Sequence, residues 1–288
     1  MIKTIAITAR PDKTEAINLV KKIINYLESK NIHIILDEKL FKKIRCNVMF
    51  QPLEEVKADL VITIGGDGTV LLTAARLKTS CPIFSINMGT LGFLTETEPN
   101  RAVESLEKIL SGDFEIEKCE RVTSIIDDKK LPDALNEVLI TSKQPAKLLH
   151  FQVKVDDKNV SSEKADGLLI ATPIGSTAYA LSAGGAIIDP RVKAFIILPI
   201  CPLGLTLKPL IIPSKSTITI KLLKPSTEAL LVIDGQFQYS LSPNALIKIK
   251  RSETPALFAR IKPVDIYRRI RKRLFYRGED IEQKDLNS

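Results

Sequence analysis

The stretch LVITIGGDGTVLLTAARL, from Leu60 to Leu77, decides the fold, because an apolar run and a helix-forming run meet there at three glycines and one aspartate. The apolar run predicts a buried strand, and the second run predicts a helix from about Thr69 to Lys78. A turn gathers glycines this densely either to allow positive φ angles or to let something approach its backbone. At the end of a parallel strand, the N–H groups of such a turn bind an anion, most naturally a phosphate; an ordinary tight turn is the alternative.

The aspartate of this turn, Asp67, limits the kinds of phosphate site that the turn can form. No Lys-Ser or Lys-Thr pair follows the glycines, so the turn is not a Walker loop. Leu71 occupies the place of the third glycine in a dinucleotide-binding G-x-G-x-x-G motif. A carboxylate beside bound phosphates repels them unless it binds the neutralising metal ion or removes a proton from an attacking hydroxyl group. The turn therefore predicts a phosphotransferase.

The first part of the chain alternates between apolar strands and amphipathic helices, which is typical of an open parallel sheet covered on both faces. We therefore expect an N-terminal α/β domain of residues 1–112. After residue 112, short alternating segments separated by turn residues predict a C-terminal antiparallel β-sandwich-like domain of residues 113–263. One helix-like insert, near residues 176–183, interrupts this domain. The strands expected in the first domain are 4–9, 32–36, 58–64 and 82–87.

Composition sets the broad class of the protein. The chain has 288 residues, of which 44% are hydrophobic and 26% charged, and these values are typical of a globular protein with two domains. Four cysteines without C-x-x-C spacing, and an N-terminus without a signal-peptide core, predict reduced thiols and a cytoplasmic location. The longest uncharged run, 167–188, is interrupted by four glycines and a proline, so we expect no membrane span.

The net charge of +8 resides mostly near the C-terminus, where residues 262–277 hold seven Lys or Arg residues and one Asp. Ile266, Ile270 and Leu274 recur there at helical spacing and predict an amphipathic helix, 264–278, that docks through its apolar stripe and can pack back on the first domain. A polyanion-binding patch is the alternative interpretation of the same charges.

Two further segments carry candidate ligand contacts. SINMGTLGFLTE, residues 85–96, places glycines in the loop after the fourth strand, where the crevice of an open α/β sheet lies. Phe93 in this loop is either a wall for a ring or a core residue. DALNEVLI places Asn136 and Glu137 in an otherwise apolar strand, where they either face water at a strand end or bind paired hydroxyl groups of a ligand.

The segment ADGLLIATPIGSTAYALSAGG, residues 165–185, runs from a buried strand into a glycine turn and a short helix. Ser176 or Thr177 is placed to cap that helix, and Tyr179 and Ser182 follow one turn apart. Hydroxyl groups at such a helix start suit a flat, polar, phosphorylated molecule. With only two histidines in the chain, a zinc site or a Ser-His triad is not expected, and a Mg²⁺ ion held mainly by substrate phosphates fits better.

In order along the chain, GGDGT, NMGTLGFL, NE, ADGLLIATPIGSTAYALSAGG and DGQ together resemble the NAD kinase family over nearly the whole sequence. The GGDG turn alone is shared with 6-phosphofructokinases and lipid kinases. The resemblance implies phosphorylation of the adenosine-ribose 2′-hydroxyl of NAD to form NADP. It also implies ATP or polyphosphate as donor, a divalent cation such as Mg²⁺, an α/β domain with a β-sandwich domain, and a homodimer or homotetramer.

The same resemblance assigns Asp67 as the general base, with Gly68 in the same binding loop, and assigns no metal ligand to the protein. Ile174 departs from the threonine common in the family, and Cys201 stands where many members carry alanine, so both bear on affinity. The predicted substrate and nucleotide contacts are Gly65, Gly66, Gly68, Thr69, Phe93, Asn136, Glu137, Lys147, Lys164, Asp166, Thr177, Ala178, Tyr179, Ser182, Cys201 and Gln236.

Two rival functions use the same residues differently. A lipid or sugar-phosphate kinase shares the glycine turn, although the sequence shows no long apolar groove or membrane-facing stretch for a lipid. A non-catalytic NAD(P)-binding regulator would use the basic C-terminal segment to bind nucleic acid, but it leaves Asp67 without a role. We therefore expect small-molecule substrates and neither a membrane nor a nucleic-acid partner.

Overall fold

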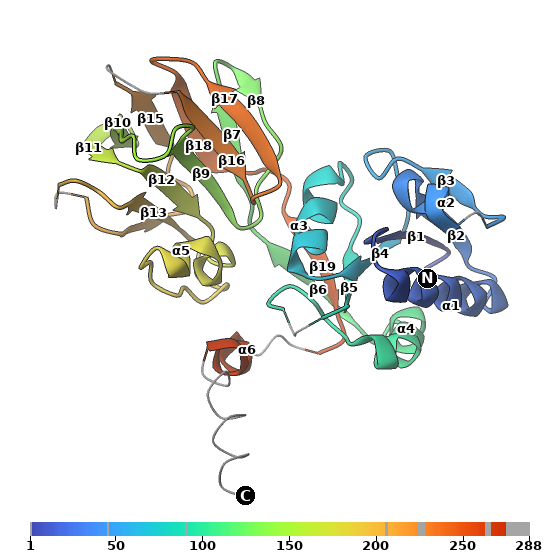
Figure 1. The fold of residues 1–288 in the computed structure, drawn as a ribbon. Coiled ribbons are helices and arrows are strands. Elements are labelled where there is room, and N and C mark those ends of the chain that lie inside the picture. Colours follow the sequence, from blue (N-terminus) through green and yellow to red (C-terminus); the bar gives the residue numbers. More distant parts are fainter. Residues whose placement is uncertain are drawn as a thin grey trace, which may run out of the picture. The chain divides into compact units, whose positions relative to one another are not determined.

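A seven-stranded sheet forms the centre of the first of two units in the computed structural model, which describes residues 2–44, 46–89, 92–204, 207–223, 228–262 and 266–274. This first unit comprises Met1–Lys118 and Leu257–Ser288, and the second comprises Cys119–Ala256. Figure 1 shows the helices and strands of both units.

The sheet of the first unit has the strand order β3-β2-β1-β4-β5-β19-β6. The neighbours from β3 to β19 pair in parallel, as the alternation of strands and helices predicts. The strands are β1 (Thr4–Ala9), β2 (His33–Asp37), β3 (Met49–Gln51), β4 (Leu60–Gly65), β5 (Ile83–Asn87), β6 (Glu115–Cys119) and β19 (Ala256–Arg260). Thus β6 and β19, which lie outside the range 1–112, belong to this sheet.

Helices cover both faces of this sheet, since strand residues alternate between the two faces and both carry buried apolar side chains. In Figure 1, α1 and α4 lie on one face and α3 on the other. Ile5, Ile7, Ile62 and Ile86 pack against α1, α2 and α4 in one core cluster. The helices are α1 (Thr14–Ser29), α2 (Glu38–Ile44), α3 (Asp67–Arg76), η1 (Pro99–Arg101), α4 (Ala102–Ser111) and α6 (Ile266–Leu274).

The second unit contains two six-stranded antiparallel sheets, of strand order β11-β10-β15-β18-β7-β8 and β14-β13-β12-β9-β16-β17. Phe151 and Ile220 of one sheet share a core with Leu168 and Ile197 of the other, so the sheets pack face to face. The strands are β7 (Val122–Ile126), β8 (Lys129–Lys130), β9 (Glu137–Ser142), β10 (Leu149–Val155), β11 (Lys158–Ala165), β12 (Gly167–Ala171), β13 (Ala194–Ile200), β14 (Leu210–Pro213), β15 (Ile218–Leu222), β16 (Ala229–Ile233), β17 (Phe237–Leu241) and β18 (Leu246–Arg251).

These two architectures confirm the predicted fold class, an open parallel α/β part with an antiparallel β-sandwich. Several boundaries differ from the prediction because local geometry moves them. Helix α3 begins at Asp67 rather than at Thr69, since Gly66 already acts as its N-cap residue. Strand β9 begins at Glu137, so Asn136 lies just before the strand and not within it. No helix in the described part of the chain is long and apolar enough to span a membrane.

Candidate active site

The glycines of the turn between β4 and α3 do not have positive φ angles, so a left-handed backbone does not explain them. Gly66 has φ −96° and ψ −173°. A Cβ atom on Gly65 would stand 2.2 Å from Oγ1 of Thr69, so this glycine lets the helix pack tightly on the strand. A Cβ atom on Gly66 would meet nothing within 4 Å, so that side of the turn is open to a ligand.

The first turn of α3 offers hydrogen-bond donors at this open side. The N-cap residue is Gly66, so no side chain caps the helix. The Gly66 carbonyl oxygen accepts hydrogen bonds from the N–H groups of Thr69 and Val70. The first N–H groups of an α-helix lack an i−4 carbonyl within the helix, and in α3 these groups lie at the open side of the turn. The positive end of the helix dipole lies at the same place and favours an anion. Gly68 is exposed, whereas Asp67 and Thr69 are half-buried.

The carboxylate of Asp67 bonds to the loop that follows β5. Its Oδ2 accepts a hydrogen bond of 2.9 Å from the N–H of Phe93, and its Oδ1 accepts one of 3.1 Å from the N–H of Leu94. A Cβ atom on Gly92 would stand 2.0 Å from Oδ1, so only glycine lets the loop approach this closely. The two glycine loops predicted to form one crevice therefore meet at Asp67. Phe93 itself is buried, with 9% of its surface exposed.

In the second unit, the backbone of Asn136 and Glu137 is held from two sides. Asp234, in the turn between β16 and β17, accepts hydrogen bonds from the N–H groups of Leu135, Asn136 and Glu137 at 2.8–2.9 Å. The Asn136 carbonyl accepts from the N–H of Thr172 at 2.9 Å. Gly175 lies so close that a Cβ atom there would stand 2.1 Å from this carbonyl oxygen.

The side chains of Asn136 and Glu137 are buried but incompletely bonded. Asn136 Oδ1 and Glu137 Oε2 have no hydrogen-bond partner among the described residues. An unsatisfied buried polar atom costs about 1–3 kcal/mol, so a ligand that bonds to it recovers that cost. Burial raises the pKa of Glu137 to about 8, and the nearby Asp234 acts in the same direction. In its protonated form, which this shift favours, the Glu137 carboxyl group can donate as well as accept.

The helical insert of the second unit consists of η2 (Gly175–Thr177) and α5 (Tyr179–Ser182). The predicted cap at Ser176 or Thr177 is wrong, since the residue before α5 is Ala178 and neither helix has a side-chain cap. Ser176 Oγ instead donates to Pro173 O at 2.6 Å and accepts from Ile188 N at 2.9 Å, and so holds the two ends of the insert together.

The predicted contacts in the second unit are mostly accessible to a ligand. Tyr179 is 43% exposed, and Ser182 is also exposed, one turn further along α5. Thr177, Ala178 and Asp166 are half-buried. The remaining exposed positions are Lys147, Lys164, Cys201 and Gln236. The predicted site residues thus lie in both units, Asp67 in the first and Asn136 in the second. Within the second unit they are not all together. Asn136 lies beside Thr172 at one end of β9 and β12, whereas Asp166 and Cys201 lie at the other end, where Gly167 pairs with Thr141 and Ile200.

Three residues that the sequence analysis did not select support this site. Asp234 belongs to the DGQ motif, but its Asp-Gly pair resembles an ordinary hairpin turn; its φ of 49° follows from that turn. Thr172 Oγ1 donates to Leu135 O and accepts from Gly175 N. Glu96 lies in the loop next to Asp67 and bonds to residues more than 160 positions away, which no local pattern reveals.

Comparison with known proteins supports one family along both units. The model of the ATP-NAD kinase N-terminal domain matches residues 5–114, and that of the ATP-NAD kinase C-terminal domain matches residues 135–261. The NAD kinase of Methanothermobacter thermautotrophicus is 41% identical over 278 residues, which cover 96% of this chain and 98% of that protein. The NAD kinase of Methanosphaera stadtmanae is 46% identical over 260 residues, or 90% and 94% of the two chains.

Solved structures agree with the sequence matches. Yeast NADH kinase complexed with NADH superposes with a TM-score of 0.88 at 25% identity, over 96% of this chain and 89% of that chain. An NAD kinase from Archaeoglobus fulgidus in complex with ATP superposes with a TM-score of 0.74 at 31% identity, over 93% and 96%. The reaction is the phosphorylation of NAD to NADP. The glycine turn, the buried Asn-Glu pair and these matches show that the chain belongs to the NAD kinase family.

Proposed function

We propose that Asp67 is the general base that removes the proton from the adenosine-ribose 2′-hydroxyl group of NAD as the phosphoryl group is transferred. The observation that carries this proposal is the pair of hydrogen bonds from Phe93 and Leu94, which fix the carboxylate at the mouth of the glycine turn. A carboxylate offers about four lone-pair sites, so it can hold two N–H groups and still accept a proton from a hydroxyl. A base held in one orientation reacts faster because no reorganisation precedes the proton transfer.

The glycine turn binds the phosphates of the donor in this proposal. The open space at Gly66 and the first amides of α3 receive phosphoryl oxygens, and the helix dipole stabilises their charge. The donor proposed is ATP, the molecule bound by the related Archaeoglobus fulgidus enzyme. A parallel assay with inorganic polyphosphate tests whether that donor also serves.

A divalent cation, Mg²⁺, is part of the same proposal. In the described residues no group of three or more His, Cys, Asp or Glu side chains gathers as metal ligands. Mg²⁺ keeps several water ligands and is often held largely by substrate phosphates, which the open side of the glycine turn can receive. The residues therefore fit such an ion, which would neutralise phosphate charge when bound.

The dinucleotide binds, we infer, to the exposed and unsatisfied groups of the second unit. Asn136 Oδ1 and Glu137 Oε2 suit the hydroxyl groups of a ligand. A hydroxyl group can donate a hydrogen bond to one of these oxygens and accept another from a neighbouring donor. Tyr179, Ser182, Lys164 and Gln236 supply exposed ring, hydroxyl, ammonium and amide groups for the nucleoside and phosphates. NADH is to be assayed beside NAD, since the related yeast enzyme was solved with NADH.

Assembly and location complete the proposal. A homodimer or homotetramer follows from the family resemblance, and sedimentation of the purified protein measures it directly. A cytoplasmic location agrees with four cysteines, Cys46, Cys81, Cys119 and Cys201, that are reduced thiols. Localisation of a tagged chain in its own cells tests that part separately.

The decisive experiment compares Asp67→Asn with Asp59→Asn. Asp59 also accepts two backbone hydrogen bonds in the first unit, from Lys3 and Thr4, so its substitution makes a matched control. With Mg²⁺, ATP and NAD, the Asp67→Asn enzyme should lose kcat by about 100-fold or more, since a general base contributes about 10²–10⁴-fold. Its dissociation constant for NAD should stay within about twofold by calorimetry. Near-normal turnover of Asp67→Asn would show that the base is another group.

A further inference from the structure

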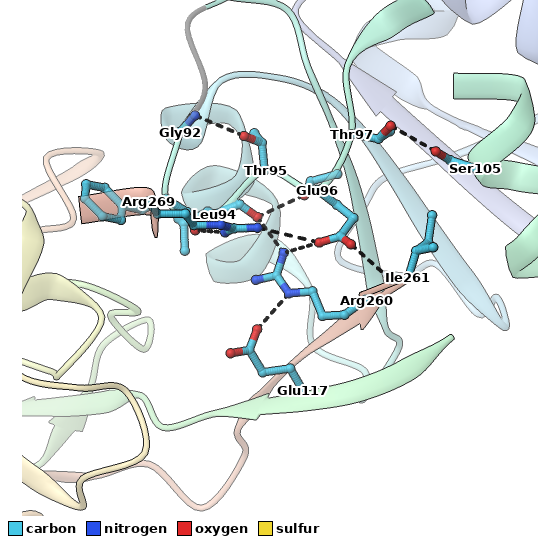
Figure 2. Close-up of polar contacts among 12 residues, drawn as sticks. Gly92, Leu94, Thr95, Glu96, Thr97, Ser105, Glu117, Arg260, Ile261 and Arg269 are labelled. Atoms are coloured by element: carbon cyan, nitrogen blue, oxygen red, sulfur yellow. Dashed lines mark hydrogen bonds and ion pairs between the residues drawn. The ribbon is translucent and has the colours of Figure 1, made fainter. Parts of the chain in front are cut away.

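The loop that holds Asp67 is itself held by arginines from the C-terminal part of the first unit. Arg269 of α6 donates to the carbonyl oxygen of Phe93, and Arg260 Nη1 donates to that of Leu94 at 3.0 Å. Figure 2 shows both guanidinium groups converging on this loop. Residues 166 and 176 positions apart in the sequence therefore meet at this loop, and one of its peptide groups, Phe93–Leu94, contacts both Arg269 and Asp67.

One peptide group connects Arg269 to Asp67. The amide joining Phe93 to Leu94 accepts from Arg269 at its carbonyl oxygen and donates to Asp67 Oδ1 at its N–H, 3.1 Å away. A cation on the carbonyl side polarises an amide and strengthens its N–H as a donor, because hydrogen bonds in a chain are cooperative. Arg269 therefore both fixes this amide in place and strengthens its bond to Asp67.

Buried ion pairs hold the Arg269 side chain beside the Phe93–Leu94 peptide group. Its side chain is only 14% exposed, and its Nη2 lies 3.7 Å from Glu96 Oε2. Arg260 Nη1 lies 3.2 Å from the same oxygen of Glu96. Arg260 Nε also pairs with Oε2 of Glu117, at 2.7 Å. Burial lowers the pKa of Arg269, and the positive charge of Arg260 lowers it further. The negative charges of Glu96, Glu117 and Asp67 raise the pKa and so oppose this change. The charges of this cluster, two arginines and two glutamates, thus nearly balance (Figure 2).

We propose that Arg269 is a positioning residue for phosphoryl transfer, which orients Asp67 through the Phe93–Leu94 peptide group without touching either substrate. The inference rests on the proposed role of Asp67 as base. It gives the basic segment near the C-terminus a role in catalysis, in place of nucleic-acid binding or docking through an apolar stripe alone.

Arg269 is better suited to a test than Arg260. Without Arg269, Glu96 still bonds to Arg260 and to the N–H of Ile261 at 3.0 Å, so no buried charge is left unpaired. Arg269→Ala should therefore fold. Its kcat should fall about tenfold or more, since a displacement of ~1 Å at a reacting group can cost on the order of 100-fold. The KM values for NAD and ATP should stay within about twofold of the unsubstituted enzyme.

The matched control is Arg271→Ala, which removes an equal charge from an exposed position of the same helix and should leave kcat unchanged. Millimolar guanidinium chloride, well below denaturing concentrations, should restore several-fold activity to Arg269→Ala but not to Asp67→Asn. Sodium chloride at the same ionic strength should restore none. A structural defect would not respond to a small cation in this way.

The outcomes separate the two proposals. If Asp67→Asn is inactive while Arg269→Ala keeps its kcat, the positioning role is wrong and the base assignment stands. If Asp67→Asn retains its turnover, the base assignment fails and the inference fails with it. A loss in Arg269→Ala that appears mainly in KM, or that guanidinium does not relieve, also overturns the positioning role. Should Arg269→Ala not fold, Arg269→Lys replaces it, with reduced kcat and unchanged KM expected and a normal kcat contradicting the proposal.

Discussion

The backbone of Gly92 lies directly against the carboxylate of Asp67, because a Cβ atom on residue 92 would stand 2.0 Å from Oδ1 and 2.8 Å from Oδ2. Gly92 lies in the loop after β5, and Asp67 begins helix α3 directly after the turn that follows the neighbouring strand β4. Their close approach lets the next two N–H groups of the loop, those of Phe93 and Leu94, reach both carboxylate oxygens.

Gly92→Ala should therefore impair catalysis more than folding. The added methyl group must displace Asp67 or the loop, and we expect kcat to fall about 100-fold, as for a reacting group displaced by ~1 Å. Gly89→Ala, in the same loop, is the control, since nothing lies within 4 Å of a Cβ atom there. Steady-state kinetics with NAD and ATP measure both variants, and equal rates for the two would contradict this role of Gly92.

Gly66→Ala should act on the phosphate donor. Nothing occupies the space of its Cβ atom and its φ of −96° suits alanine, so the melting temperature should stay nearly unchanged. The methyl group enters the space assigned to phosphoryl oxygens, and the KM for ATP should rise about tenfold, which corresponds to ~1.4 kcal/mol of binding. Gly65→Ala, whose Cβ atom would meet Thr69, should instead lower the melting temperature. An unchanged KM in Gly66→Ala would place the phosphates elsewhere.

Asp234→Asn should weaken NAD binding through the backbone. An asparagine amide has one acceptor oxygen in place of two, and its NH₂ group would oppose an N–H group of Leu135, Asn136 or Glu137. We expect a loss of about 1–3 kcal/mol of stability and a higher dissociation constant for NAD. Calorimetry and thermal unfolding measure the two effects. Asp157→Asn, in a hairpin turn with φ 63°, is the control and should change neither.

The stability of the protein should fall as the pH rises between about 4.5 and 8, partly because of Glu137. Burial raises the pKa of this carboxyl group from 4.5 to about 8, so between those values the folded state binds the proton that the unfolded state has lost. The contribution is complete below pH 4.5 and disappears as the pH passes 8. Burial also raises the pKa of Asp234, to about 6, which adds to the fall at lower pH.

Glu137→Gln removes this titration and should flatten the decline in melting temperature from pH 6 to 8, a range in which Asp234 contributes less. Glu228→Gln, at an exposed surface pair with Lys143, should leave the decline as it is. A decline of the same steepness in Glu137→Gln and in the unsubstituted protein would show that Glu137 is ionised at neutral pH.

Removal of divalent cations should abolish turnover without abolishing dinucleotide binding. Excess chelator leaves the donor phosphates unneutralised beside Asp67, whereas Asn136 and Glu137 need no metal ion to hold hydroxyl groups. We expect full recovery on addition of Mg²⁺, and a dissociation constant for NAD within about twofold throughout. Undiminished NADP formation in chelator would mean that phosphate charge is neutralised by protein groups alone.

The sequence alone determined the features that depend on neighbouring residues. Apolar runs and glycines within a few positions of each other define β4, its turn and α3, because helix and strand periodicity are local properties. Asp67 could be selected as a candidate because its sequence neighbours are glycines of a turn. Asn136 and Glu137 could be selected because their sequence neighbours are apolar strand residues. The same locality explains the errors at Ser176 and Thr177, since a cap depends on backbone geometry that residue type does not fix.

Only the tertiary structure decided what these residues touch. Asp234 reaches Asn136 across 98 positions because β16 and β9 pair in register, and Arg269 reaches Phe93 across 176 because α6 returns to the first unit. Such contacts depend on strand order and on the path of the returning chain, which spacing in the sequence does not encode. The sequence named the reacting groups, and the long-range pairing of strands and loops set the hydrogen bonds that orient them.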